Sequence, residues 1–191
     1  MLEPLSLTKS RIRRDLLTLF FTNPSQRYYL RELQRILGYS AGNIRRELLK
    51  FQQDDLMTTH RVGNLLYYAV NRTHPLFKEL KSIVTKTVGV EGILTATLST
   101  VDDIAIAFIY GSFAAKKETS SSDIDLMIIG SPDTSALHDT LARIEHKLQR
   151  EINPTIYSMD EYRAKKRAKR GFITELLRRP RIMLKGSEDD L

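Results

Sequence analysis

The sequence predicts a two-domain α/β protein, in which a helical N-terminal domain with a β-hairpin precedes a C-terminal mixed sheet with flanking helices. Apolar residues recur at helical spacing through the first 55 residues, whereas strands and helices alternate after about residue 102. The net charge of +7 is also uneven: residues 1–80 carry 13 Lys+Arg against 7 Asp+Glu, and the remainder carries 17 against 16. We expect domains at 1–75 and 101–191, joined by a helical connector at 76–100.

Three short helices are predicted in residues 6–55. Ser6 or Thr8 is expected to cap the first helix, whose apolar face runs from Ile12 to Phe20. The second ends at Gly38, a residue type that favours the left-handed backbone found after helices. The third begins after Ser40, which is a good N-cap.

Two strands follow these helices. Met57–His60 and Leu65–Val70 contain β-branched and aromatic residues, and Gly63-Asn64 between them is a hairpin signal. Three helices followed by a β-hairpin is the order of a winged helix-turn-helix, a fold that binds duplex DNA.

The third helix has a polar face opposite its apolar one. Amides and Arg read base edges in the major groove, while Lys more often contacts phosphate. An ordinary solvent-facing surface is the alternative interpretation of these side chains. The candidate DNA-binding residues, including one at the hairpin, are Ser40, Asn43, Arg45, Arg46, Lys50 and Arg61.

The segment YYLRELQRILGYSAGNIRRELLKFQQDDLMTTHRVGNLLYYAVN (28–71) resembles the winged helix-turn-helix of ArsR/MarR-like regulators. The likeness lies in the Leu-Arg-Glu-Leu start, the Ser-capped third helix and the exit from Tyr68 to Asn71. It implies a cytoplasmic transcription regulator that binds double-stranded DNA as a homodimer. Some members of that family sense metals through Cys, but this chain has no Cys and therefore no thiolate sensor.

The most informative stretch is GSFAAKKETSSSDIDL, which begins at Gly111. Gly111-Ser112 follows a predicted strand, Ile104–Tyr110, where a glycine lets the backbone approach a phosphate. Asp123 and Asp125 alternate on the next strand, so both carboxylates face one side. Two close carboxylates suit a hard divalent cation such as Mg²⁺. A phosphate cradle beside a metal pair is the arrangement that nucleotidyl transfer needs.

This stretch resembles the minimal nucleotidyltransferases of the DNA polymerase beta-like superfamily, over about residues 90–185. The resemblance implies that Gly111 and Ser112 bind the triphosphate of a nucleotide and that Asp123 and Asp125 hold Mg²⁺. Family members usually carry a basic residue and a glycine four residues after the first Gly. This chain has Ala115-Lys116 there, so one phosphate contact is shifted to Lys116 or lost.

The resemblance also implies a third carboxylate on a neighbouring strand, which completes the metal site and acts as a general base. Asn153 stands where that carboxylate is expected, and an amide cannot accept a proton at neutral pH. Glu151 would share the face of Asn153 in a regular strand and is the candidate substitute. The sequence therefore leaves two interpretations: impaired catalysis, or catalysis with Glu151 as the third carboxylate.

We expect a DNA-binding regulator whose C-terminal domain binds nucleotide and Mg²⁺ or serves as a scaffold. The alternative is an active enzyme that transfers a nucleoside monophosphate to a protein, a small molecule or an RNA end. The apolar runs are too short to span a bilayer, so no membrane is expected as a partner. The basic run 163–170 is either a polyanion contact or a solvated helix face.

Overall fold

The chain divides into two compact units, which are described separately. The structure is a computed structural model that describes residues 10–115, 117, 122–168 and 171–191. Unit 1 comprises Met1–Gly92 and Lys147–Gln149, and unit 2 comprises Ile93–His146 and Arg150–Leu191. The division falls inside the segment predicted as a helical connector. None of the helices in the described ranges is both long and apolar enough to cross a membrane.

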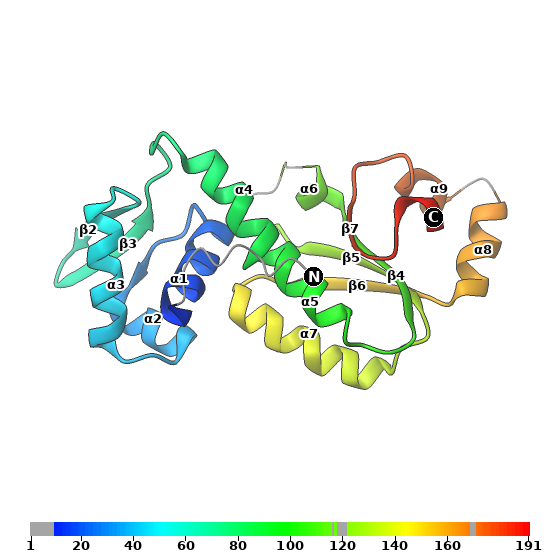
Figure 1. The fold of residues 1–191 in the computed structure, drawn as a ribbon, viewed down its shortest axis with the longest axis horizontal. Helices are drawn as coiled ribbons and strands as arrows, with labels where there is room; N and C mark the ends of the chain where they lie inside the picture. Colours follow the sequence, from blue (N-terminus) through cyan, green and yellow to red (C-terminus); the bar gives the residue numbers. More distant parts are fainter. Residues whose placement is uncertain (1–9, 116, 118–121, 169–170) are drawn as a thin grey trace. The chain divides into compact units, whose positions relative to one another are not determined.

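Unit 1 combines four helices with a small antiparallel sheet of order β1-β3-β2 (Figure 1). The predicted hairpin is present, and a two-residue strand, β1, adds to its edge through the pairs Tyr28↔Tyr68 and Tyr29↔Tyr67. A strand this short carries no alternating pattern, so the sequence did not predict it. The elements are α1 (Arg11–Thr22), β1 (Tyr28–Tyr29), α2 (Leu30–Leu37), α3 (Ala41–Gln53), β2 (Met57–Val62), β3 (Leu65–Val70) and α4 (Phe77–Thr87).

Local capping explains where these helices begin and end. Ser10, rather than Ser6 or Thr8, caps α1 by accepting a hydrogen bond from the backbone N–H of Arg13; residues 1–9 lie outside the described residues. Gly38 follows α2 with φ +72°, as expected for a left-handed residue after a helix. Ser40 caps α3 by accepting from the N–H of Asn43.

Buried apolar side chains hold the helices of unit 1 on its sheet. The third helix contributes its predicted apolar face, and α1 contributes almost all of its second half. Asn71 joins the base of the hairpin to the end of α3, because its Nδ2 donates to the backbone oxygen of Asp55 at 2.9 Å. The core includes Leu16, Leu19, Phe20, Leu33, Ile44, Leu48, Phe51, Met57 and Tyr68.

Unit 2 is built on a four-stranded sheet of order β6-β5-β4-β7. Only β5 and β6 are parallel, and the other neighbours are antiparallel, so the sheet is mixed as predicted. The connection from β5 to its parallel neighbour runs through the helix α7. The elements are α5 (Val90–Leu98), β4 (Ile104–Tyr110), α6 (Gly111–Ala114), β5 (Ile124–Gly130), α7 (Thr134–Leu148), β6 (Ile152–Tyr157), α8 (Met159–Arg167), α9 (Phe172–Leu176), β7 (Ile182–Lys185) and a 3₁₀ turn, Glu188–Asp190.

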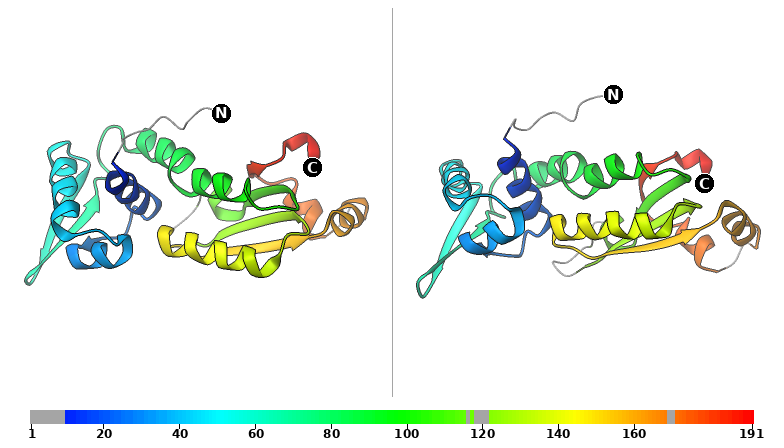
Figure 2. Two further views of the ribbon diagram at one scale, coloured as in Figure 1. Left: turned by 60° about the horizontal axis from the view of Figure 1, so that its bottom comes forward. Right: turned by 90° about the horizontal axis from the view of Figure 1, so that it is seen from below.

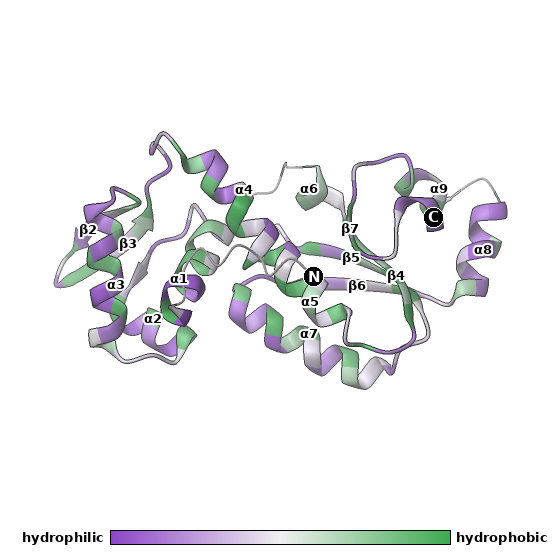
Figure 3. Cartoon of the chain, in the orientation of Figure 1, coloured by the Kyte–Doolittle hydropathy of each residue, from purple (hydrophilic) through white to green (hydrophobic). Residues whose placement is uncertain are grey.

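The two central strands of unit 2, β4 and β5, consist mostly of apolar residues (Figure 3), and consecutive residues in each strand are buried, so both faces of the sheet are covered. On one face Phe108 and Met127 pack with Tyr162 of α8 and with Ile173 of α9. Helices α5 and α7 lie along the sheet (Figure 2). Their apolar residues are buried, as are the residues of β4 and β5 that alternate with those packed under α8 and α9. The buried residues of the two helices include Leu94, Leu98, Leu137, Leu141 and Ile144.

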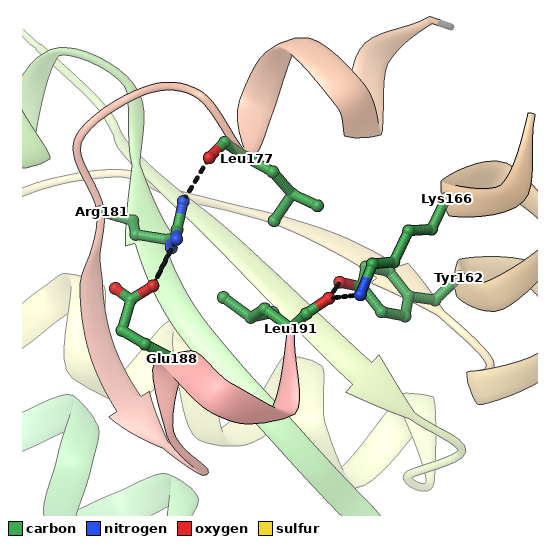
Figure 4. Close-up of polar contacts among 6 residues, drawn as sticks. All are labelled: Tyr162, Lys166, Leu177, Arg181, Glu188 and Leu191. Atoms are coloured by element: carbon green, nitrogen blue, oxygen red, sulfur yellow. Dashed lines mark hydrogen bonds and ion pairs between the residues drawn. The ribbon is translucent and has the colours of Figure 1, made fainter. Parts of the chain in front are cut away.

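The end of the described chain closes the face that α8 and α9 cover (Figure 4). The hydroxyl of Tyr162 donates to the backbone oxygen of Leu191 at 2.6 Å, and Lys166 donates to the same oxygen. Arg181 pairs with Glu188 and donates to the backbone oxygen of Leu177 at 2.7 Å. Lys166 belongs to the predicted basic run, so part of that run serves packing.

Candidate functional site

The end of β4 and the start of β5 meet at one edge of the sheet in unit 2. Tyr110 is the last residue of β4, and α6 begins at once with Gly111. Asp123 directly precedes β5, and Asp125 is its second residue. Tyr110 pairs with Asp125 in the antiparallel register, so their side chains leave the same face of the sheet. The fold therefore brings the Gly-Ser pair next to the two aspartates.

Glycine is required at position 111 for two physical reasons. Its φ is +70°, a conformation that costs an L-residue about 1–2 kcal/mol. A Cβ there would also lie 2.1 Å from Oδ2 of Asp125, far inside van der Waals contact. The absent side chain leaves the space that the Asp125 carboxylate occupies.

The two carboxylates repel each other. Asp125 is half-buried and Asp123 is exposed. Burial raises the pKa of Asp125, and the negative charge of Asp123 raises it further. No cation of the described residues forms an ion pair with either carboxylate. An external cation between them would relieve this repulsion.

Asn153 completes the group from the neighbouring strand. It is the register partner of Asp125 across the parallel β5–β6 pair. Its Nδ2 donates to Oδ2 of Asp123 at 3.1 Å. The amide therefore occupies a position beside Asp123, but it has no basic atom that could take a proton.

The chain matches the family described as polymerase beta, nucleotidyltransferase over residues 93–188, which is half of its 191 residues. It belongs to this family. Its N-terminal part, including the predicted winged helix, lies outside the match. The nucleotidyltransferase match begins at the start of unit 2 and includes the Gly-Ser pair, both aspartates and Asn153.

Two solved structures are similar to part of this chain. One is a crystal structure of a toxin–antitoxin with AMP-PNP, which is 16% identical in sequence. The likeness covers 52% of this chain and 76% of that chain, with a TM-score of 0.38. The other is a mutant of the toxin–antitoxin MntA-HpeT, with 14% identity, coverage of 51% and 73%, and a TM-score of 0.35. No curated protein matches the chain.

The donor set of this nucleotidyltransferase site suits Mg²⁺ held partly by a substrate. Mg²⁺ is commonly bound through one or two carboxylates together with phosphate oxygens and water. Within the described part of the chain, no group of three or more His, Cys, Asp or Glu side chains is arranged to hold a metal ion. Asp123 and Asp125 are therefore the carboxylates at this position that could hold such an ion.

The remaining predicted residues of the site differ in how they are placed. Glu151 is exposed just before β6, and its backbone oxygen accepts from the N–H of Ile124 at 2.9 Å. It does not form a three-carboxylate group with the Asp pair, and its catalytic role stays a prediction. Ser112 lies half-buried in α6. Lys116 lies outside the described residues.

Sequence reasoning missed two side chains that hold the site in place. Tyr110 spans the sheet from β4 to β6, because its hydroxyl is 3.1 Å from Oγ1 of Thr155. Arg150 is buried, and its Nη1 donates to the backbone oxygen of Ser122 at 2.7 Å, directly before Asp123. The position of Tyr110 next to Gly111 was an available signal. Nothing in the sequence marked Arg150, since arginine is usually exposed.

In unit 1 the predicted DNA-binding residues lie on α3 and on the hairpin. Ser40 is occupied as the helix cap. Arg45, Arg46 and Arg61 are exposed, and none forms an ion pair with another described residue. Asn43 and Lys50 are also exposed on α3.

Lys50 has a structural partner that the sequence pattern did not reveal. Its Nζ lies 3.1 Å from Oε1 of Glu47, whose Oε2 is 2.8 Å from Nε of Arg13. Burial alone would raise the pKa of Glu47, but hydrogen bonds and charge from both cations outweigh it and lower that pKa. Lys50 therefore supports the attachment of α3 to α1 as well as presenting charge to solvent.

Proposed function

We propose that the nucleotidyltransferase domain binds a nucleoside triphosphate with Mg²⁺ and transfers nucleotidyl groups poorly, and that unit 1 binds duplex DNA as a transcription regulator. The observation that carries the catalytic part is the hydrogen bond from Asn153 to Asp123. It supports weak transfer, because Asn153 lies beside Asp123 and its amide cannot serve as the proton acceptor that nucleotidyl transfer uses. The bound nucleotide would then act mainly as a ligand.

The nucleotide pocket is proposed at the edge of the sheet where β4 and β5 meet. Gly111 has no side chain, so the Asp125 carboxylate lies directly against its backbone, and Ser112 offers a hydroxyl and an N–H at the start of α6. Asp123 and Asp125 would hold Mg²⁺ against the phosphates, and Lys116 would add charge. Mg²⁺ would neutralise charge on the phosphates and orient them.

Weak transfer follows from the chemistry at position 153. Loss of a general base typically lowers the rate by about 10²–10⁴-fold. Nucleotide binding does not need a general base, so a domain of this kind keeps its affinity for nucleotide while its transfer rate falls. Asn153→Asp should restore an acceptor and increase transfer.

The first test is calorimetric titration of ATP, GTP, CTP and UTP with Mg²⁺ into wild type and Asp123→Ala. We expect binding that requires both Mg²⁺ and Asp123. Wild-type protein that binds none of the four nucleotides would contradict the proposal and leave the fold as a scaffold.

DNA binding by unit 1 is supported by the unpaired cations on α3 and the hairpin. Arg45, Arg46 and Arg61 are free of ion pairs with described residues, so their charge is available to phosphates or bases. The order of three helices and a hairpin is the winged helix-turn-helix order, and such regulators commonly read paired half-sites as dimers. Nucleotide binding would then bias DNA affinity or dimerisation.

Arg46→Ala tests the DNA part. Loss of a base contact should weaken binding to the specific operator by about 1–3 kcal/mol, measured by fluorescence anisotropy at several salt concentrations. Arg179→Ala, an equal charge change at an exposed position of unit 2, is the control and should have little effect. Operator binding by Arg46→Ala at wild-type affinity would remove Arg46 from the interface.

An active nucleotidyltransferase is the second candidate, since the Gly-Ser pair and both aspartates are retained and Glu151 lies near β6. Label from an α-labelled nucleotide would then appear on a protein, a small molecule or an RNA end. Glu151→Gln separates the candidates: it should abolish transfer if Glu151 is the base. If transfer is impaired, that variant changes little and Asn153→Asp gains activity.

A further inference from the structure

An exposed aromatic ring lies close to the candidate nucleotide site. Phe172 is the first residue of α9 and is 49% exposed. Among the described residues of unit 2, it is the one large apolar side chain exposed by more than a third. The apolar residues that follow it in α9, Ile173 and Leu176, are buried in the core. The helix is therefore anchored while its first side chain is left in water.

Phe172 has a rigid partner that links it to the Asp pair. Its ring centroid is 5.8 Å from that of Tyr110, with the planes at 71°, an edge-to-face arrangement. The hydroxyl of Tyr110 lies 3.1 Å from Oγ1 of Thr155, a hydrogen bond that favours this position of the ring on the sheet. Tyr110 is the register partner of Asp125 and precedes Gly111. The exposed ring is thus fixed one side chain away from the carboxylates.

We propose that Phe172, supported by Tyr110, stacks against the base of a nucleotide whose phosphates lie at Gly111 and the Asp pair. This inference rests on the nucleotide binding proposed above. Exposed aromatic rings are stacking platforms for nucleobases, because every base has a π face. Phe offers no donor or acceptor, so the platform selects by ring area and not by base edge. Purine nucleotides should bind more tightly than pyrimidine nucleotides, with ATP and GTP nearly equal.

The binding test compares wild type, Phe172→Ala and Phe172→Tyr with ATP and with inorganic tripolyphosphate, each with Mg²⁺. Loss of one stacked base should weaken ATP binding by about tenfold or more in Phe172→Ala. Phe172→Tyr retains an aromatic ring and should weaken ATP binding much less than Phe172→Ala does. Tripolyphosphate has no base, so its affinity should be the same in all three proteins.

A fluorescence test observes the stacking directly. The chain has no Trp, so Phe172→Trp introduces a single indole beside the site. ATP should quench its emission, whereas tripolyphosphate should not. Leu49→Trp places an indole at a position of similar exposure, 48%, on α3 of unit 1, and its emission should not respond.

The outcomes separate failure of the platform from failure of the pocket. ATP affinity that is unchanged in Phe172→Ala, in a protein that binds ATP more tightly than tripolyphosphate, would place the base elsewhere and overturn the inference. Equal affinity for ATP and tripolyphosphate would show a phosphate site with no base platform, and would also overturn it. Binding of neither ligand would refute the pocket and the platform together.

Discussion

Glu47 of unit 1 and Asp125 of unit 2 are both shielded from water, and the chain treats them in opposite ways. Glu47 has two cationic partners, Arg13 at 2.8 Å and Lys50 at 3.1 Å, and its pKa is lowered. Asp125 has a second carboxylate nearby and no ion pair with a described residue, and its pKa is raised. Glu47, which supports the fold, has counter-ions within the chain, whereas Asp123 and Asp125 have none among the described residues and would obtain one from the proposed Mg²⁺.

This difference predicts opposite consequences for stability. A charge that is neutralised within the chain stabilises the folded state, and its removal should be harmful. A charge that is repelled within the chain destabilises the folded state until a ligand binds, so its removal should be harmless or beneficial without ligand. Paired measurements of stability and ligand affinity can therefore distinguish a structural acid from a site acid.

The largest effect is expected from Asp125→Asn. It removes one of two carboxylates offered to Mg²⁺, and even the supporting partners of metal ligands are worth about 10–100-fold in affinity, so Mg²⁺-dependent ATP binding should fall by at least about 100-fold. Without Mg²⁺ the melting temperature should stay the same or rise, because the repulsion from Asp123 disappears. Calorimetry and thermal unfolding measure the two results.

Asp139→Asn is the matched control for that experiment, since Asp139 is exposed on α7, away from β5. It should change neither ATP affinity nor melting temperature. If Asp125→Asn lowered the melting temperature without Mg²⁺, then Asp125 would be stabilised by the chain after all, and the contrast with Glu47 would be lost.

Gly111→Ala should give the next effect. The new Cβ would meet Oδ2 of Asp125 at 2.1 Å in a backbone with φ +70°, so the carboxylate has to move. We expect about 10–100-fold weaker ATP binding, comparable to loss of a side chain that orients a metal ligand. Gly42→Ala is the control, because a Cβ at that helical position meets nothing within 4 Å. Wild-type affinity in Gly111→Ala would mean that Asp125 is not needed in this position.

The sequence could predict the elements that carry their own local signals. Gly38, Ser40 and the Gly63-Asn64 turn fixed the helix and hairpin boundaries of unit 1, and alternating apolar residues fixed β4 and β5. The sequence also indicated that Gly111 and Asp125 belong to one site. It could not predict the bond from Asn153 to Asp123, because strand register decides which side chains meet. The contacts of Lys50, Arg150 and Tyr110 are likewise tertiary and leave no periodic trace.

Glu47→Gln should destabilise unit 1 by about 2 kcal/mol at neutral pH, since hydrogen bonds to charged groups are worth about 1.5–3 kcal/mol. The folded pKa of Glu47 is lowered, so its contribution is present above the pKa of the unfolded state and is lost as pH falls through the folded value. Urea unfolding at neutral and acid pH should show the difference between variant and wild type shrinking in acid. Glu79→Gln, at an exposed position on α4, should show no such difference.

The smallest effect should come from Tyr162→Phe, which removes a hydrogen bond made by an uncharged hydroxyl. The hydroxyl of Tyr162 donates to the backbone oxygen of Leu191, but Lys166 donates to the same oxygen and remains in the variant (Figure 4). Loss of one of two donors should cost about 1 kcal/mol or less of unfolding free energy. ATP affinity should not change, because the hydroxyl of Tyr162 contacts the end of the described chain and not the aspartates. A fall in ATP affinity without loss of stability would instead connect this core to the site, and Asp125 would no longer be set apart from the rest of unit 2.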